Sequence, residues 1–333
     1  MKLGLVKLVT ISFILCSCSN KDTFVLSFGS CNNQLINNTL WAPIASHHPD
    51  LFIWGGDIIY SDTEDMEFMK KNYRILFEDS SYVAFKNQVP VTGTWDDHDY
   101  GLNDGGVHYQ KKDSAQQIFL DFFEVANNDP RRERKGVYHL KTHKVDGAAI
   151  NFIILDTRYF RSDLKKDPTG EKRYIPNNNK KTTMLGDVQW KWLENTLNNS
   201  KAQFNVIVSS IQFLSYEHGY ESWGTMPLEV EKMKRIITDS KAKGVLFLSG
   251  DRHIAEISGT RIEGLDYPLI DFTSSGMTHS FSSFSGEPNV YRISEVVAEK
   301  NFGLLFFNFK ENTVKMQIRG ENDLLLEEVI QKY

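Results

Sequence analysis

The chain has 333 residues, of which 41% are hydrophobic, 12% aromatic and 24% charged, and its formal net charge is −5 at pH 7. This composition is typical of a globular protein and excludes a disordered, collagen-like or disulfide-scaffold protein. The slightly acidic balance offers no basic stripe for a phosphate backbone, so no specific nucleic-acid binding is predicted.

The first segment of the chain is a candidate export signal. Lys2 and Lys7 stand ahead of an apolar run over 8–15, which is too short to span a bilayer. The Leu-Cys-Ser-Cys motif that ends at Cys18 resembles the bacterial lipobox, in which the signal is cut before the final cysteine and that thiol is acylated. We therefore expect a lipoprotein signal peptide over 1–17, a lipid on Cys18, and an extracytoplasmic protein, periplasmic or at the cell surface, anchored to a bacterial membrane. The alternative for this run is a buried first strand.

Short apolar runs alternate with helical patterns along the rest of the chain, which predicts one α/β domain over 18–333. The strand candidates are 24–28, 51–54, 89–94, 149–155, 205–209, 245–249, 269–273, 304–309, 314–318 and 324–330. The helix candidates are 66–77, 114–123, 187–197 and 227–240. Two polar stretches, 127–136 and 167–181, are expected to be surface insertions.

The chain has three cysteines, and the export signal accounts for two of them but not for Cys31. Cys16 would leave with the signal and Cys18 would carry lipid, so Cys31 has no partner for an internal disulfide. A lone cysteine in an exported protein indicates a dimer link, a reactive thiol or a metal ligand. An acylated Cys18 cannot form a disulfide either, and we expect a monomer.

A Gly-Gly-Asp-Ile-Ile-Tyr motif, with Asp57 and Tyr60, directly follows the strand candidate 51–54. This places Asp57 at the carboxyl end of a strand, where α/β sheets bind their ligands. The two glycines allow close backbone approach, which suits a bridging metal ligand. The alternative is an aspartate that caps the next helix.

The densest polar motif is Trp-Asp-Asp-His-Asp-Tyr-Gly-Leu-Asn-Asp, which contains Asp96, Asp97, His98 and Asn103 and follows the strand candidate 89–94. So many neighbouring carboxylates repel one another unless a cation neutralises them. The motif therefore predicts a cation site, with a solvated acidic loop as the alternative.

A third motif ends the apolar strand candidate 245–249 in Asp-Arg-His. Asp251 and His253 are alternate residues at a strand end, so one carboxylate oxygen and one imidazole nitrogen can face the same ion. A lone histidine is more often structural, but this spacing favours metal ligation.

Taken in order, these motifs resemble the PhoD-like (alkaline phosphatase D) family of metallophosphoesterases, over about residues 24–279. The matching motifs are Ser-Cys at 30–31, Gly-Asp-Ile-Ile-Tyr at 56–60, Trp-Asp-Asp-His-Asp at 95–99, Leu-Asp-Thr-Arg at 155–158, Met-Leu-Gly-x-x-Gln-x-x-Trp-Leu at 184–193 and Ser-Gly-Asp-Arg-His at 249–253. The resemblance implies a four-layer αββα sandwich with two central mixed sheets and a dinuclear metal site at the strand ends.

The resemblance also implies which residues hold the metals. Ferric iron (Fe3+) would be bound by Cys31, Asp57, Tyr60 and His253. Calcium (Ca2+) would share Asp57 and be bound by Asp97 and Asp251. Asp96 can exchange roles with Asp97, because spacing does not decide which of two adjacent carboxylates turns inward. Waters or Asn103 would complete the calcium shell.

The activity implied is that of a phosphoric ester hydrolase, an alkaline phosphatase or phosphodiesterase, in which a metal-bridged hydroxide attacks phosphorus. Arg158 would bind the phosphate oxygens, with a salt bridge as the alternative. His98 would stabilise or protonate the leaving oxygen, with His279 as a second candidate. Asn103 and His279 would also contact the substrate, a small phosphate ester or a polymer, and the choice between monoester and diester stays open.

Two other classes of function fit parts of the sequence. A catalytically retired surface lipoprotein that binds a glycan or a peptide should have lost at least one implied metal ligand, and none is missing. A glycosidase would use paired carboxylates but has no use for Cys31 or Tyr60. The complete ligand set therefore favours the hydrolase.

Overall fold

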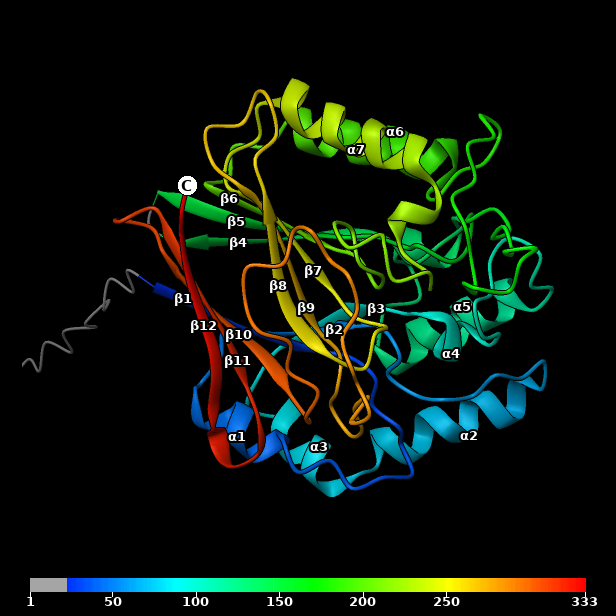
Figure 1. Ribbon diagram of the computed structural model, residues 1–333. Coiled ribbons are helices and arrows are strands. Elements are labelled where there is room, and N and C mark those ends of the chain that lie inside the picture. Colours follow the sequence, from blue (N-terminus) through cyan, green and yellow to red (C-terminus); the bar gives the residue numbers. More distant parts are fainter. Residues whose placement is uncertain (1–22, 146) are drawn as a thin grey trace, which may run out of the picture.

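The computed structural model describes residues 23–145 and 147–333, and its architecture is set by two six-stranded sheets packed face to face (Figure 1). The first sheet has the order β12 (Leu325–Lys332), β11 (Thr313–Arg319), β10 (Phe302–Asn308), β1 (Thr23–Gly29), β2 (Leu51–Gly55) and β3 (Val91–Thr94). The second has the order β4 (His139–Val145), β5 (Ala148–Ile154), β6 (Phe204–Val208), β7 (Val245–Ser249), β9 (Leu269–Ser274) and β8 (Ala255–Thr260). The segment 1–17 and Cys18 lie outside the described residues.

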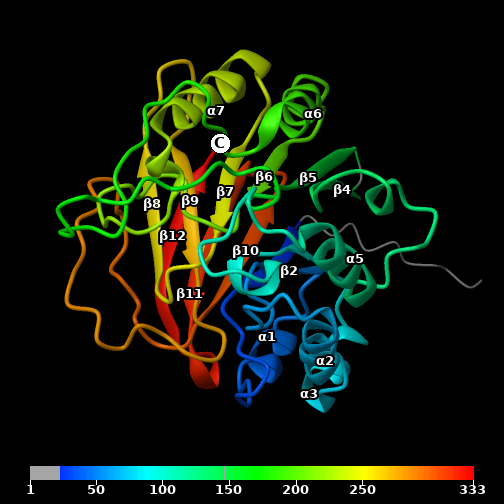
Figure 2. The same ribbon diagram turned by 90° about the vertical axis from the view of Figure 1, so that its right-hand side faces the viewer.

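Helices cover the outer face of each sheet (Figures 1 and 2). Those on the first sheet are α1 (Trp41–Ser46), α2 (Met66–Phe77), α3 (Ser80–Lys86) and α5 (Lys112–Phe122), while α6 (Gly186–Asn198) and α7 (Pro227–Ser240) cover the second. Both sheets are mixed, since β1, β2 and β3 are parallel, as are β5, β6, β7 and β9, while the other pairings are antiparallel. The predicted four-layer α/β sandwich is confirmed.

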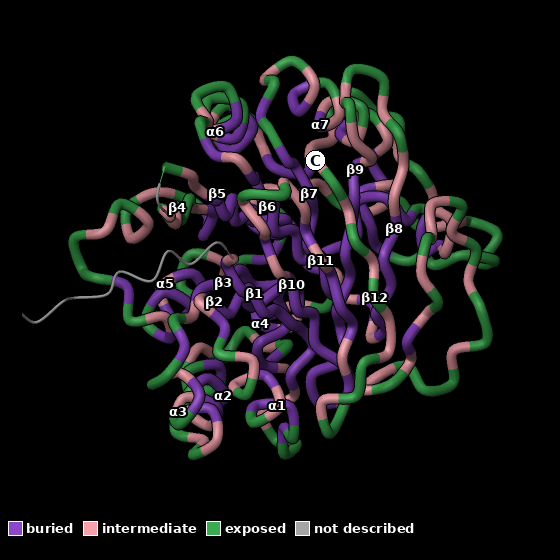
Figure 3. The backbone as a smooth tube through the Cα atoms, turned by 90° about the vertical axis from the view of Figure 1, so that its left-hand side faces the viewer, coloured by how far each residue is buried: buried purple, intermediate pink, exposed green. Residues whose placement is uncertain are grey.

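The main core lies between the two sheets, where the central strands are buried along most of their length (Figure 3). Phe28 on β1 packs edge to face against Phe272 on β9, with ring centroids 4.9 Å apart. Phe204 and Phe307 make a similar contact at 5.3 Å. Burial of these rings on both sheets fixes how the sheets face each other, and hence where their carboxyl ends meet.

Most predicted elements are present, and α2 and α7 have the predicted bounds. The side chain of Asp65 accepts hydrogen bonds from two backbone amides at the start of α2, and Pro227 begins α7, which are common helix starts. The edge strand β4 was not predicted, because its side chains are exposed or half-buried and form no apolar run. The short helices α1, α3 and α4 (Asp97–Tyr100) span too few turns to show helical periodicity.

Gly93 in β3 has no room for a side chain. A Cβ atom there would lie 2.5 Å from Trp54 Cβ and 2.6 Å from the Trp54 carbonyl oxygen. Trp54 is its direct partner in the parallel β2/β3 ladder, so relief of this clash must separate two strands. We expect Gly93→Ala to lower the free energy of unfolding by about 1 to 3 kcal/mol, measured by urea denaturation.

Gly55→Ala is the matched control for this prediction. A Cβ atom at Gly55 has its nearest neighbours at 3.6 Å, which is ordinary van der Waals contact. The Gly55→Ala midpoint should therefore lie much nearer to that of the parent protein. Equal midpoints for the two variants would contradict the steric explanation.

Within the described residues, no helix has the length and apolar character needed to cross a membrane.

Candidate functional site

The predicted ligand motifs lie together at one end of the molecule, the end that Figure 2 views. Cys31 follows β1, Asp57 follows β2, Asp97 begins α4 directly after β3, and Asp251 follows β7. Because the parallel strands of both sheets finish at this end, residues far apart in sequence become neighbours.

Four of the predicted metal ligands have backbone φ angles in the left-handed region. The values are 60° for Cys31, 48° for Asp57, 69° for Asp251 and 55° for His253. A residue other than glycine in this region costs about 1 kcal/mol or more, and such residues cluster at functional sites. The surrounding fold therefore holds these four side chains in place against a local backbone preference.

One group of ligand atoms combines sulfur, nitrogen and oxygen. Ligand atoms of Cys31, Asp57 and His253 all lie within 4.8 Å of one another. The Cys31 Sγ is 3.4 Å from Asp57 Oδ2, and the Tyr60 hydroxyl is 3.0 Å from His253 Nε2. A thiol, a phenol, an imidazole and a carboxylate together fit a transition metal better than magnesium or calcium.

Ser275, which follows β9, supports this group and was not predicted. Its Oγ lies 3.0 Å from Cys31 Sγ and accepts a hydrogen bond from the His253 backbone amide at 2.8 Å. Burial raises the pKa of the Cys31 thiol to about 12, although the hydrogen bond with Ser275 opposes this shift. A thiolate at this position needs a bound cation, which is consistent with a metal-ligand role.

Two further groups consist mainly of carboxylates. Asp57, Asp97 and His98 form one, and Asp96, Asp97 and Asp251 form the other, again with ligand atoms within 4.8 Å of one another. Asp57 therefore belongs to both the sulfur-containing group and a carboxylate group. It occupies the position expected of a ligand shared by two cations.

The structure distinguishes the adjacent Asp96 and Asp97. Asp96 Oδ1 accepts hydrogen bonds from Arg158 Nε at 2.5 Å and Ser210 Oγ at 2.6 Å. Asp97 Oδ2 accepts from the Asp104 backbone amide at 2.7 Å, and Asp97 lines the cavity described below. This geometry favours Asp97 as the ligand that faces the cavity. Asp96 Oδ2 is buried without a hydrogen-bond partner, so the cluster retains an unused acceptor.

The carboxylates destabilise one another in their charged forms. Burial, followed by the charge of Cys31, raises the pKa of Asp57 well above its ordinary value. Burial and the charge of Asp97 raise the pKa of Asp251 to about 7. Oxygen donors crowded together in this way fit a hard divalent cation, which would offset their repulsion.

His98 is held by a carboxylate that was not predicted to have a role. Its Nδ1 donates a hydrogen bond to Asp62 Oδ2 at 2.6 Å, and its ring packs on Tyr60 at 4.2 Å. Burial lowers the pKa of His98, but the hydrogen bond to Asp62 and the charge of Asp97 outweigh it and raise the pKa to about 9. Nε2 is the ring nitrogen left to contact a ligand.

Arg158 was predicted to bind phosphate, but its side chain is completely buried. Besides Asp96, it donates to Glu221 Oε2 at 2.5 Å, and Glu221 Oε1 lies 2.8 Å from Arg161 Nε. The guanidinium therefore lies behind the carboxylates and positions them. The geometry supports the salt-bridge alternative and gives no support to direct contact with phosphate.

A cavity of about 280 Å3 opens onto these groups. Its lining residues are Asp97, His98, Asn103, Asp104, Arg173, Tyr220, Glu221, Asp251, Arg252, His253 and Phe281. Asn103 lies on the wall of this cavity together with Asp97 and Asp104. The half-buried His279 lies beside the site, with its ring 4.5 Å from that of His253 and 5.1 Å from that of Tyr60.

Comparison with known proteins agrees with this geometry. A family model described as PhoD-like phosphatase matches residues 13–322. The chain belongs to the PhoD-like phosphatase family. The resemblance drawn from the strand-end motifs is thereby confirmed.

Two PhoD-like relatives show how far the similarity extends. Alkaline phosphatase D of Bacillus subtilis (strain 168) is 25% identical over 223 residues, which cover 60% of this chain and 38% of that protein. The chain therefore spans well under half the length of this curated relative. A solved structure of PhoD superposes with a TM-score of 0.71 at 17% sequence identity, covering 93% of this chain and 72% of the other, and confirms the fold.

The residues of the strand-end motifs lie close together in the structure, but several contacts that hold them were not predicted. Asp62 stands in the same strand-end segment as Tyr60, and Ser275 stands in the Thr-Ser-Ser-Gly run that ends β9, so both could have been considered. The residues around Glu221 in the sequence do not indicate a role in the site, because its partner Arg158 lies 63 positions away.

Proposed function

We propose that this chain hydrolyses phosphate esters in the cavity at the strand ends, with two cations held side by side. The observation that carries the proposal is the overlap of three groups of metal-ligand atoms, with Asp57 and Asp97 each belonging to two of them. Membership in a phosphatase family supports the same reaction class. When bound, two adjacent cations would neutralise phosphate charge and lower the pKa of water to generate the attacking hydroxide.

The residues present fit the cations implied by the family resemblance. Ferric iron would be held by Cys31, Asp57, Tyr60 and His253, because sulfur, phenolate and imidazole donors suit a transition metal. Calcium would share Asp57 and be held by Asp97 and Asp251, whose oxygens suit a hard cation.

His98 is the proposed proton donor to the leaving oxygen. It lines the cavity, and its hydrogen bond to Asp62 fixes the ring and leaves Nε2 for a substrate oxygen. Asn103, on the same wall, is proposed to orient the substrate, and His279 stays a second candidate for this role.

Paired substrates test the proposed activity. Purified protein would be assayed with 4-nitrophenyl phosphate and with bis(4-nitrophenyl) phosphate, so that the leaving group is constant while the remaining phosphate substituent changes. Hydrolysis of at least one ester, lost on removal of metals and regained on their return, is the expected result. No hydrolysis of either by metal-replete protein would reject the proposal.

The metal assignment makes a spectroscopic prediction. A phenolate bound to ferric iron gives visible charge-transfer colour, so Tyr60→Phe should bleach the purified protein. A calcium-selective chelator should abolish activity reversibly and leave the colour of the parent protein unchanged. Absorbance spectra and metal analysis of Tyr60→Phe and of Tyr216→Phe, a tyrosine outside the cluster, provide the comparison. A colourless, fully active parent protein containing zinc would refute the iron and calcium assignment.

We also propose that Cys18 carries a lipid that anchors the protein to a membrane on its extracytoplasmic side. The support is the Leu-Cys-Ser-Cys motif that follows an apolar run with a basic flank. Cys18→Ala should abolish lipid attachment and move the protein to the aqueous phase in detergent partitioning, whereas Cys16→Ala should not. Identical partitioning of Cys18→Ala and the parent would contradict the proposal.

A further inference from the structure

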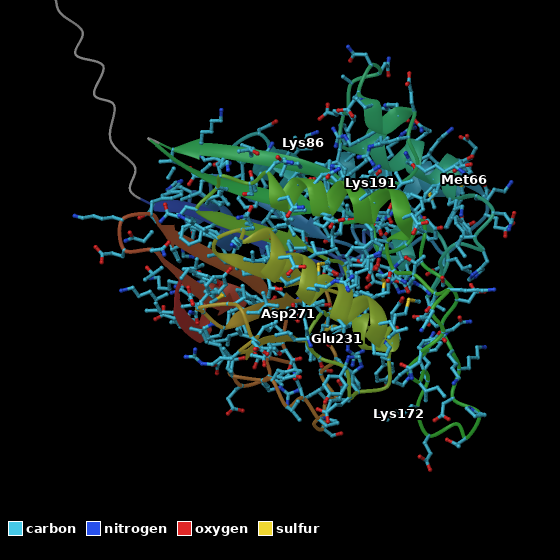
Figure 4. All side chains as sticks on the ribbon, turned by 90° about the horizontal axis from the view of Figure 1, so that it is seen from above. Met66, Lys86, Lys172, Lys191, Glu231 and Asp271 are labelled. Carbon is cyan, nitrogen blue, oxygen red and sulfur yellow. The ribbon has the colours of Figure 1, made fainter. Side chains whose placement is uncertain are left out.

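The cavity is bordered by three chain segments that hydrogen-bond to one another. The predicted surface insertion 167–181 contacts the loop 216–222 through a Tyr174 backbone amide bond to the Gly219 carbonyl at 2.8 Å. Lys172 Nζ donates to the Glu217 carbonyl at 2.9 Å, and Figure 4 shows Lys172 on a loop that projects beyond the helices. The third segment, 281–290, is joined to Glu217 by a hydrogen bond from the Val290 amide. Together these segments form a rim, which we define as 167–181, 216–222 and 281–290.

The rim fixes one arginine that the catalytic proposal does not use. Arg252 is 92% buried, and its Nη2 donates to both carboxylate oxygens of Glu287 at 2.8 Å. Its guanidinium lies over the ring of Tyr220, 4.4 Å from the centroid. The Nε of Arg252 is buried with no hydrogen-bond partner. Arg252 lines the cavity, and through Tyr220 and Glu287 it holds two segments of the rim in place.

Two aromatic rings are exposed at the same opening. Tyr220 is 40% exposed and Phe281 is 37% exposed, and both line the cavity. The Phe281 amide donates to the His253 carbonyl at 2.7 Å, which ties the backbone of Phe281 to that of a predicted metal ligand. Within the described residues, every other side chain that lines the cavity is charged or polar. An acyl chain would find no continuous apolar surface here, whereas a flat ring can stack on an aromatic side chain.

We propose that the rim binds the nucleoside part of a nucleotide substrate. The base stacks on Tyr220 and Phe281, and Arg252, whose guanidinium lies over one face of the Tyr220 ring, holds that ring in position. This inference rests on the proposed phosphatase function and narrows its substrate class to phosphate esters that carry a planar base. Stacking of a base on an aromatic side chain is strong enough to change substrate preference severalfold or more.

Two substrates that differ only by the base test the proposal. 5′-AMP and ribose 5-phosphate share the same primary ester, and we expect a higher kcat/KM for 5′-AMP. If the enzyme accepts only diesters, thymidine 5′-(4-nitrophenyl) phosphate and 2-deoxyribose 5-(4-nitrophenyl) phosphate form the equivalent pair. Tyr220→Leu should lower the ratio of kcat/KM within the pair by about tenfold. Phe281→Leu should also lower this ratio. Agreement between the two variants would show that the effect does not come from a folding defect in one of them.

Tyr216→Leu is the matched control. Tyr216 is on the same loop and is 47% exposed, but it does not line the cavity, so the ratio should stay at the parent value.

The outcomes separate the two proposals. Equal kcat/KM for both substrates, unaffected by Tyr220→Leu, would overturn the nucleoside site while the phosphatase function stands. If no ester is hydrolysed, the phosphatase proposal fails, and calorimetric titration with 5′-AMP and ribose 5-phosphate then tests the rim alone. Tighter binding of 5′-AMP that is lost in Tyr220→Leu would support the site, and equal binding would refute it.

Discussion

Replacing Asp57 by asparagine is expected to lower kcat/KM for phosphate ester hydrolysis by about a thousandfold. Asp57 is shared between the sulfur-containing group and a carboxylate group, so its neutralisation weakens both proposed cation sites. Metal ions stabilise transition-state charge by several kcal/mol, and about 4 kcal/mol corresponds to about three powers of ten in rate. Metal analysis should show loss of both ions, whereas Asp97→Asn should reduce mainly the calcium.

Stability measurements distinguish this loss from unfolding. Burial and neighbouring negative groups raise the pKa of Asp57, which means that its charged form destabilises the folded protein at neutral pH. In metal-stripped protein, Asp57→Asn should therefore unfold at the same temperature as the parent or at a higher one. The exposed Asp187→Asn serves as the control and should retain activity. Near-parental kcat/KM for Asp57→Asn would remove Asp57 from the site.

Arg158→Met is expected to lower the free energy of unfolding by about 3 to 5 kcal/mol, the usual cost of removing one partner from a buried ion pair. Asp96 would lose its cationic partner, although Glu221 would keep Arg161. Urea denaturation measures the effect. Lys70→Met, which breaks the exposed Lys70–Glu67 pair, should cost less than about 1 kcal/mol.

A double variant tests whether the uncompensated charge is the cause. Adding Asp96→Asn to Arg158→Met removes the negative charge that the first substitution leaves unpaired, and it should restore part of the lost stability. A purely steric role for Arg158 predicts additive losses instead. Unchanged stability of Arg158→Met would mean that the ion pair contributes nothing to the fold.

The fold could be predicted from the sequence wherever a local pattern carries the information. The apolar run of β2 followed by Gly-Gly-Asp, and the helical periodicity of α7, are visible within a dozen residues. β4 could not be found in this way, because its register comes from pairing with β5 and its side chains are mostly exposed.

The difference between local patterns and long-range contacts also explains which site residues could be predicted. Asp57 and Asp97 could be predicted to meet because each follows a strand of the first sheet, and parallel strands finish at the same edge. Asp251 follows β7 of the second sheet, so its place beside them depends on how the two sheets pack. The burial of Arg158 could not be predicted, since it depends on Glu221 in a distant loop. The contribution of the insertion 167–181 to the site could not be predicted either. It depends on a hydrogen bond of 2.7 Å from the Tyr174 hydroxyl to Asp104 Oδ2.

The crowding of buried carboxylates at the strand ends has a consequence for how readily the chain is digested by proteases. Any cation that binds the folded chain and not the unfolded chain adds stability that grows with the logarithm of its concentration. In a medium poor in divalent ions, mutual repulsion among Asp57, Asp96 and Asp251 favours local opening, and opened chains are the form that proteases cleave. Binding of a cation among these carboxylates would therefore slow digestion by an added protease, and a chelator would speed it.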